Sequence, residues 1–349
     1  MAKSNKTHIM KIAFAVIFVI IAALSGCSLR IKDKKIPVRV LILPKFEIGE
    51  IAGDFPGEAQ YFYEEYLSGG EAFEIDGYPD TNRLYYKDGA AMFLLGQGKV
   101  NAALNTSAVL SDKRFDFSDA YVLCVGCGGT AKEYGVLGDV FVITSAVDFD
   151  LGHRADPREM TNRSGTTWFH DESYDDIAVL RLDQSFADRV YELAENVSLE
   201  TTERTVNFLR REYPGEAWAE RRPQVLRGTS VTSDNYWKGI YDHQNALLIT
   251  ETYNCTDPFA VTEMEDIAAG QAVKRFGLLE RLIILRVGVN MDVYPNGMTP
   301  EMLWGVQSDD HIASEDSMES VDIFETGMRN CFAVGKVLID AILDGTLRS

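Results

Sequence analysis

Short apolar runs that end in glycine, proline or polar residues restrict the fold of this chain more than any other feature. Such runs are typical of buried strands, and amphipathic segments of helical length lie between many of them. Alternating strands and helices predict an α/β fold, a three-layer sandwich with a central, mostly parallel β-sheet flanked by helices. The expected strands cover 38–43, 84–87, 90–95, 120–125, 140–146, 225–229, 247–250 and 281–287, and the expected helices cover 58–67, 99–110, 184–194, 264–276 and 324–343.

Two segments carry more specific expectations. In the helix expected over 99–110, Val100, Ala103, Leu104 and Ala108 share one face, which predicts that this face is buried. Residues 153–182 are polar and irregular, which predicts a surface excursion.

Glycine-rich strand ends mark the expected ligand edge of the sheet. They are Gly96-Gln97-Gly98, Gly126–Gly129 and the segment 287–292. In α/β sheets, ligands bind where strands end and where glycine lets the backbone come close. We therefore expect a small-molecule site there, with Gly98, Gly126 and Gly128 as backbone contacts.

The first residues have the layout of an export signal. Three lysines precede an uncharged apolar run over 12–24, and Ser25-Gly26-Cys27 follows. The run is shorter than the roughly 20 residues of a membrane span. A cysteine placed directly after small residues, as in a bacterial lipobox, can carry a thioether-linked diacylglycerol.

These features predict three regions. Residues 1–26 are expected to be a lipoprotein signal peptide, residues 27–37 a lipidated Cys27 with its tether, and residues 38–349 one α/β domain. The protein is then extracytoplasmic, with a lipid anchor in the cell membrane or an outer membrane. The alternative is a plain N-terminal anchor helix in which Cys27 is incidental.

Charge and composition exclude several classes of partner. Removal of residues 1–26, which carry three lysines and no acidic residue, changes the formal net charge from −19 to −22. Because nucleic-acid polymers are bound largely by Lys and Arg, no such partner is expected. Cys124 and Cys127 form a C-x-x-C in an apolar run, where small core residues are the better interpretation. Histidine is scarce and has no zinc-type spacing to cysteine, so we expect no metal and no other cofactor.

Several segments together resemble the nucleoside phosphorylase and nucleosidase superfamily. They are LLGQGKVNAALNT (94–106), VLCVGCGGTAKEYGVLGDVFV (122–142), VTEMED (261–266) and ILRVGVN (284–290). Three more resemble one branch, the purine nucleoside permease family: FPGEAQ (55–60), SAVDFDLGHRADPREM (145–160) and TSDNYWKG (232–239). The resemblance implies a nucleoside phosphorylase-like fold and a purine nucleoside as ligand.

The resemblance also implies roles for residues around the sugar. The Met-Glu pair of the superfamily falls on Met264 and Glu265, whose carboxylate would accept hydrogen bonds from the ribose hydroxyls. The acid that orients or deprotonates the attacking water falls on Glu58, with Glu47 as the alternative.

Further positions concern the base. Nucleosidases that protonate a purine at N7 carry Asp at the position of Asn290, whose amide can donate and accept but cannot act as an acid. Asn290 would suit a 6-oxopurine, and Asp292 is the alternative proton donor. Tyr236 lies where the family has an aromatic ring against the base, and Trp237 is a second candidate.

The resemblance points to water as the nucleophile. Phosphorylases of the superfamily hold phosphate with arginines, but Cys124 occupies one such position and no arginine lies between Arg39 and Arg83. A phosphate dianion needs such cations or a helix N-terminus.

Three functions follow. The first is an extracytoplasmic purine nucleosidase for nucleoside uptake or salvage. The second is a non-catalytic nucleoside-binding lipoprotein that supports transport through a separate channel. The third is a structural lipoprotein on a formerly catalytic fold. Relatives often build their sites across subunits, which makes a homo-oligomer a further expectation.

Overall fold

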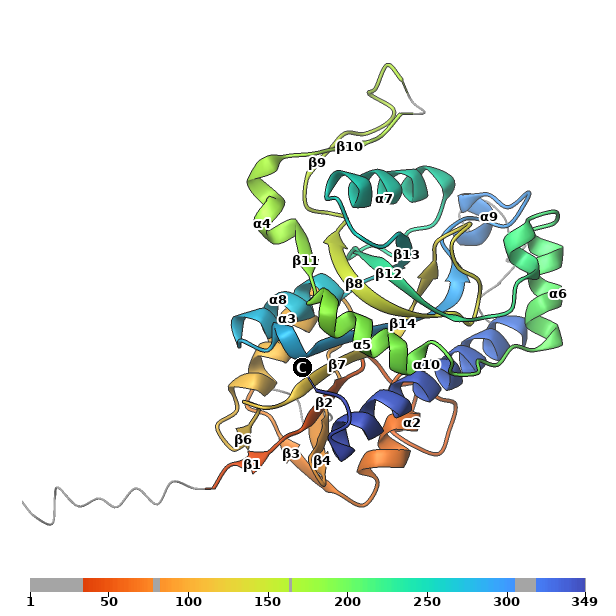
Figure 1. Ribbon diagram of the computed structural model, residues 1–349. Helices are drawn as coiled ribbons and strands as arrows, with labels where there is room; N and C mark the ends of the chain where they lie inside the picture. Colours follow the sequence, from red (N-terminus) through yellow and green to blue (C-terminus); the bar gives the residue numbers. More distant parts are fainter. Residues whose placement is uncertain (1–33, 78–81, 163–164, 305–317, 349) are drawn as a thin grey trace, which may run out of the picture. The chain divides into compact units, whose positions relative to one another are not determined.

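A mixed β-sheet with helices packed on it organises the computed structural model, which describes residues 34–77, 82–162, 165–304 and 318–348 (Figure 1). In these residues the main sheet has ten strands. They are β2 (Val40–Leu43), β3 (Glu71–Glu74), β4 (Arg83–Lys87), β5 (Ala90–Met92), β7 (Tyr121–Thr130), β8 (Val140–Asp148), β11 (Val179–Arg181), β12 (Val225–Thr232), β13 (Phe259–Glu263) and β14 (Leu282–Met291). Four shorter strands lie outside it: β1 (Ile36–Pro37), β6 (Phe115–Asp116), β9 (His153–Arg154) and β10 (Trp168–Phe169).

The helices come from both halves of the chain. The α-helices are α2 (Gln60–Phe62), α3 (Lys99–Ser111), α4 (Asp175–Ala178), α5 (Gln184–Ala194), α6 (Glu203–Glu212), α7 (Ile240–Thr252), α8 (Asp266–Arg275), α9 (Pro300–Trp304) and α10 (Met318–Asp344). A π-helical turn, η1 (Tyr63–Leu67), continues α2, and 3-10 turns are η2 (Glu172–Tyr174), η3 (Ala217–Glu220) and η4 (Leu279–Arg281). α10 packs along β14 and β7, whereas α7 contacts β12 and β13 (Figure 1).

Five strands of the main sheet close into a barrel, in the order β8, β12, β13, β7 and β14, because β14 pairs with both β7 and β8. The expected α/β arrangement of helices on a central sheet is confirmed, but the sheet is mixed and partly closed, and not the expected mostly parallel sandwich. The pairs β2–β5, β2–β7, β7–β14, β8–β12 and β12–β13 are parallel, but β3–β4, β4–β5, β7–β13, β8–β11 and β8–β14 are antiparallel. Apolar runs show that strands are buried, but they carry no information about strand direction.

The glycines after Val125 form strand, not the expected turn. β7 continues through Gly126–Gly129 to Thr130 and pairs with β14 along its length. A Cβ built on Gly126 would lie 2.7 Å from Glu58 Oε1 and 2.8 Å from Arg286 Nη1. These glycines therefore serve to admit neighbouring groups close to the strand.

Helix α3, which follows Gly96-Gln97-Gly98, buries the face opposite to the one expected. Val100 and Leu104 of α3 are 67% and 61% exposed, while Asn105 and Thr106 are buried. Asn105 Nδ2 donates to Leu95 O at 2.6 Å, which ties the helix to the end of the preceding strand segment. A polar side chain with a backbone partner thus replaces an apolar one at the contact.

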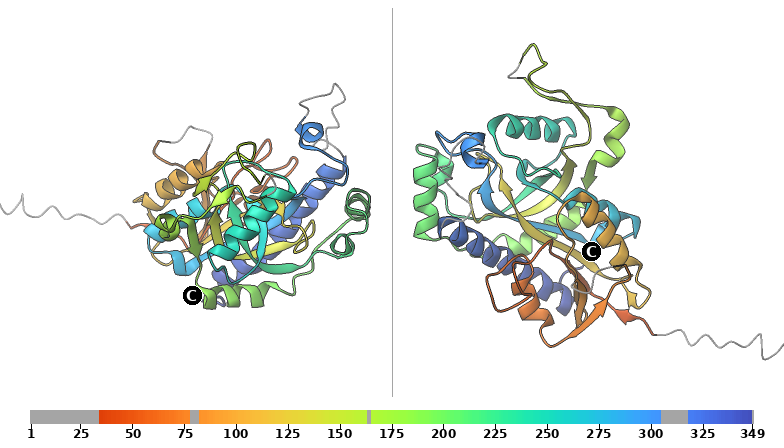
Figure 2. Two further views of the ribbon diagram at one scale, coloured as in Figure 1. Left: turned by 90° about the horizontal axis from the view of Figure 1, so that it is seen from above. Right: turned by 180° about the vertical axis from the view of Figure 1, so that it is seen from behind.

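Other elements confirm or correct the sequence prediction. The β4–β5 hairpin, α5 and β14 are confirmed. Residues 247–250, expected as a strand, belong to α7, and β13 and α6 were missed. The segment 153–182 contains an arm, β9–β10, that extends away from the sheet (Figures 1 and 2), and also β11, which joins the sheet beside β8.

The structure does not test the predictions for the N-terminal residues 1–33. The chain divides into units of residues 1–36 and 37–349, and Cys27 with the expected signal peptide lies outside the described residues. Within the described ranges, no helix is long and apolar enough to cross a membrane.

Candidate functional site

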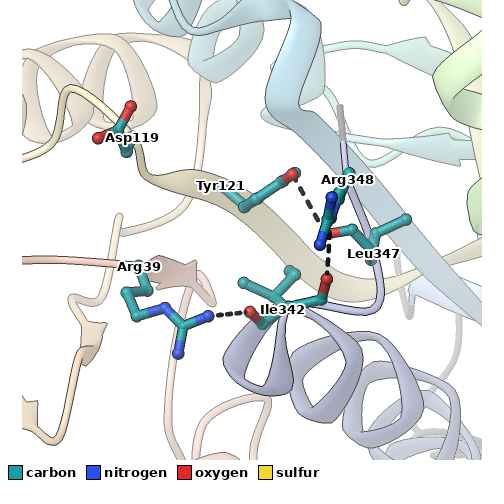
Figure 3. A pocket seen from close by; sticks show the side chains of 7 residues that line it. Arg39, Asp119, Tyr121, Ile342, Leu347 and Arg348 are labelled. Atoms are coloured by element: carbon teal, nitrogen blue, oxygen red, sulfur yellow. Dashed lines mark hydrogen bonds between the residues drawn. The ribbon is translucent and has the colours of Figure 1, made fainter.

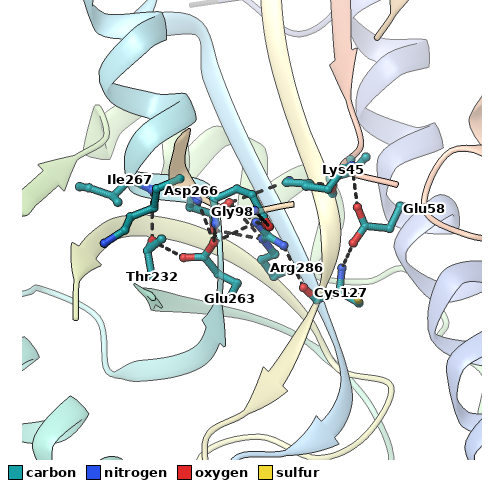
Figure 4. A network of polar contacts seen from close by, with 12 residues as sticks. Lys45, Glu58, Gly98, Cys127, Thr232, Glu263, Asp266, Ile267 and Arg286 are labelled. Carbon is teal, nitrogen blue, oxygen red and sulfur yellow. Dashed lines mark hydrogen bonds and ion pairs between the residues drawn. The ribbon is translucent and has the colours of Figure 1, made fainter. Parts of the chain in front are cut away.

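Buried charged residues meet beside the later halves of β7 and β14 (Figure 4). Lys45 follows β2, Cys127 belongs to β7, Arg286 belongs to β14, and Glu265 directly precedes α8. Because β2, β7 and β14 are mutually parallel neighbours, their carboxyl ends point to one edge of the sheet, where ligands of α/β proteins bind.

Arg286 is the centre of this network and was missed from the sequence. Its Nη2 donates to Glu263 Oε2 at 2.9 Å, Glu265 Oε2 at 3.0 Å and Asp266 Oδ1 at 2.6 Å. Its Nη1 donates to Cys127 O at 2.9 Å. The available signal was a single charge inside the apolar run ILRVGV, because a buried arginine needs acidic partners.

Glu58 is buried beside Arg286. Its Oε2 accepts the Lys45 N–H at 2.7 Å and its Oε1 accepts the Cys127 N–H at 2.8 Å. Burial raises the pKa of Glu58, and the Lys45 and Arg286 charges oppose that rise. A carboxylate with a raised pKa is a better proton acceptor near neutral pH.

Glu47, the alternative acid, has a different task. Its carboxylate accepts the N–H groups of Ala59 and Gln60 at 2.9 and 2.7 Å, and also those of Ile48 and Gly57. These bonds fix the loop that leads into α2 and use the oxygens of Glu47. Of the two carboxylates, Glu58 is the one that lies in the network around Arg286.

Glu265 joins the network to the start of α3. Its Oε1 accepts the Gly98 N–H at 3.0 Å while its Oε2 accepts from Arg286. Met264 beside it is half-buried. Glu58, Glu265 and Gly98, singled out separately in the sequence, are thus brought into one contiguous set of contacts.

The start of α3 is surrounded by further carboxylates. The Lys99 N–H donates to Asp234 Oδ1 at 2.7 Å, and Lys99 Nζ donates to Asp148 and Asp150 at 2.9 and 2.8 Å. The two N–H groups that open this helix are therefore bonded to carboxylates of the chain itself. An external anion would have to displace them.

Asp292 and Asn290, the two positions considered for protonation of the purine base, have different hydrogen-bond partners. Asp292 is fully buried, and its oxygens accept from the Lys132 N–H at 3.0 Å and pair with His243 Nδ1 at 2.6 Å. Asn290 is half-buried, and its Nδ2 donates to Met291 O at 3.2 Å. Asp292 thus ties β14 to α7, whereas Asn290 retains amide capacity for a ligand.

Trp237 and Tyr236, the two aromatic candidates, differ in burial. Trp237 is 8% exposed and stacks on Phe149 with ring centroids 5.1 Å apart, as a core side chain does. Tyr236 is 46% exposed. Tyr236 is therefore the more exposed ring of this pair.

A surface pocket lies away from these residues (Figure 3). Its volume is about 300 Å³, and its lining includes Arg39 and Tyr121, which stand at the amino ends of β2 and β7. Arg39 donates to the carbonyls of Ile342 and Leu343, the last turn of α10. Arg39 therefore caps the end of α10. None of the predicted site residues lines this pocket.

The described residues show no group of three or more His, Cys, Asp or Glu side chains arranged to hold a metal ion. The buried carboxylates of the site bond to Arg286 and to main-chain N–H groups.

The fold is that of nucleosidases. A 5'-methylthioadenosine/S-adenosylhomocysteine nucleosidase from Colwellia psychrerythraea matches with a TM-score of 0.52 and 16% identity, over 90% of this chain and 96% of that one. A futalosine hydrolase mutant of Helicobacter pylori matches with a TM-score of 0.53 and 14% identity, over 87% and 99%. At these identities the likeness concerns the fold alone.

The chain belongs to the purine nucleoside permease family, whose model matches residues 37–346. A probable purine nucleoside permease of Schizosaccharomyces pombe is 28% identical over 220 residues, 56% of this chain and 63% of the relative. The purine nucleoside permease of Candida albicans is 28% identical over 253 residues, 66% of this chain and 61% of the relative. The matches thus span about three fifths of these curated relatives.

Glu263 makes the stability of this site depend on pH. Burial, together with the Asp266 charge, raises the pKa of Glu263 to about 7, against the Arg286 charge. Since the folded state holds this proton more tightly than the unfolded chain, the contribution of Glu263 to the free energy of unfolding falls as pH rises from about 4.5 to about 7. Glu263→Gln should flatten that fall, by up to about 3 kcal/mol across the window.

Urea unfolding at several pH values between 4.5 and 8 measures this slope. Glu203→Gln, which changes an exposed carboxyl, is the control and should keep the wild-type slope. Equal slopes in Glu263→Gln and the wild type would contradict the assignment.

Proposed function

We propose that this protein binds a purine nucleoside and cleaves its N-glycosidic bond with water. The observation that carries the proposal is the meeting of Glu58, Glu265 and Arg286 around one buried point. The family and the nucleosidase fold support the ligand class. The cellular role in this proposal is nucleoside uptake or salvage outside the cytoplasm.

The residues divide the chemistry between them. Glu265 accepts hydrogen bonds from the ribose hydroxyls with its remaining lone pairs. Glu58 takes a proton from water as its oxygen bonds to C1′, and the bonding pair of the broken C–N bond stays with the purine. Tyr236 stacks on the base and the Asn290 amide hydrogen-bonds its edge. Because that amide has no acidic proton, the departing base is protonated from solvent.

Electrostatics favour water over phosphate. The buried network holds four carboxyl groups, Glu58, Glu263, Glu265 and Asp266, but only Lys45 and Arg286 as cations among the described residues. Gly98 and Lys99 already donate their N–H groups to carboxylates. A phosphate dianion would add negative charge where it is already in excess.

Product analysis on inosine and guanosine, with and without inorganic phosphate, tests this function. We expect free ribose and free base in both cases, because the two cations of the described network, Lys45 and Arg286, already bond to groups of the chain itself. Ribose 1-phosphate as the main product would rule out hydrolysis, and the absence of any product would leave the binding function described next.

The second candidate function is nucleoside binding without cleavage, in support of transport through a separate channel. It is favoured by Asn290, which cannot protonate a base, and by Asp292, whose oxygens are engaged with Lys132 and His243. This function needs the same ligand-binding residues but no base at Glu58.

Glu58→Gln separates the two functions. In an enzyme, loss of the base should lower the rate of base release by about 10²–10⁴-fold, while the dissociation constant for inosine, measured by calorimetry, changes little. Glu50→Gln, an exposed carboxyl of the preceding loop, is the matched control. A wild type that binds inosine but releases no base would establish the binding function.

We also propose that the protein is exported and held at a membrane by lipid on Cys27. The apolar run and the Ser25-Gly26-Cys27 sequence support this proposal. Cys27→Ser should move the protein from the membrane fraction to the soluble fraction and abolish incorporation of labelled fatty acid. Unchanged labelling in Cys27→Ser would contradict it.

A further inference from the structure

Lys45 is a buried lysine in contact with the site. It follows β2 and Pro44, and it is 2% exposed. Its Nζ donates to Val125 O at 2.8 Å and lies 4.0 Å from Asp266 Oδ1. Its main-chain N–H donates to Glu58 Oε2 at 2.7 Å, so Lys45 lies between two acids of the network (Figure 4).

A lysine in this position requires an explanation. Burial of an ammonium group is costly unless nearby charges compensate it, and an apolar side chain could occupy the same space beside Val125. Arg286 already bonds directly to Glu263, Glu265 and Asp266. Among the described residues, Glu58 makes no direct hydrogen bond to Arg286: its two oxygens are held by main-chain N–H groups, one of them from Lys45.

The groups that face Glu58 come from five parts of the fold. Lys45 follows β2, Cys127 lies on β7, Arg286 on β14, Glu265 before α8, and Cys331 on α10. Burial raises the pKa of both thiols, which keeps Cys127 and Cys331 neutral. Two cations and one carboxylate, Lys45, Arg286 and Glu265, therefore set the charge around Glu58.

We propose that Lys45 is a positioning residue for Glu58: its main-chain N–H aims the carboxylate, and its buried ammonium group keeps that carboxylate ionised as a proton acceptor. The catalytic part of this inference rests on the proposed nucleosidase function. The two contributions are separable, because every residue except proline at position 45 retains the N–H and only a cation supplies the charge.

Lys45→Met tests the charge alone. It keeps the main-chain bond to Glu58 and a side chain of similar length. Loss of the cation should move the acid limb of the kcat/KM profile for inosine up by about one pH unit, a tenfold loss at fixed pH on that limb. KM should change little, and raising the pH should restore the rate.

Lys132→Met is a matched control. The Lys132 N–H also binds a buried carboxylate, Asp292, at 3.0 Å, while its Nζ lies outside the network, 3.6–3.7 Å from Glu216 and Glu133. This variant should keep the wild-type pH profile. Lys45→Gln is the second variant if Lys45→Met does not fold, because its amide can still donate to Val125 O but carries no charge.

A readout without catalysis separates this inference from the proposed function. The carboxyl C=O stretch of protonated Glu58, assigned as the infrared band absent from Glu58→Gln, reports the titration directly. Its midpoint should rise in Lys45→Met and in Lys45→Gln but not in Lys132→Met. An unchanged midpoint would overturn the role of Lys45, whether or not the wild type cleaves nucleosides. A shifted midpoint in a protein without turnover would overturn only the proposed catalysis.

Discussion

The buried guanidinium of Arg286 is the interaction on which the site depends. One side chain bonds to three acidic residues at the β13–α8 junction and to the Cys127 carbonyl of β7. Through Glu265 the same set of contacts reaches Gly98 at the start of α3. Without Arg286, the three carboxylates would remain buried without their main counter-ion, a situation that typically destabilises a protein by several kcal/mol.

Closure of the barrel puts Arg286 in this place. β14 pairs with β7 from Leu282 to Met291 and with β8 around Arg286, so its side chains have little freedom. Glycine in β7 then decides what can approach: with a Cβ at Gly126, neither Glu58 nor Arg286 could occupy its position. The same residues therefore specify both the fold and the site.

The sequence predicted parts of this arrangement. Glu58 and Glu265 came from the resemblance and Gly98 from a glycine-rich strand end, and the three belong to one set of contacts. Arg286 and Lys45 were missed because arginines were sought at the positions where phosphorylases hold phosphate, and these two cations lie elsewhere. Strand direction, barrel closure and the buried face of α3 could not be predicted, because they depend on pairing between distant segments. On α3, periodicity selected Val100 and Leu104, yet the helix buries Asn105 and Thr106.

The N–H groups that open α3 are satisfied from within the chain, which bears on the charge of the ligand that this end of the helix can accept. A helix N-terminus attracts negative charge, and here Glu265 and Asp234 supply it from within the chain. Lys99, the cation nearest to that terminus, is held by Asp148 and Asp150. A nucleoside with uncharged hydroxyls can share these carboxylates by donating hydrogen bonds to them, whereas a phosphate can only compete with them. Under the proposed function, a preference for an uncharged ligand over phosphate would arise from groups of the folded chain itself and would not depend on the phosphate supply around it.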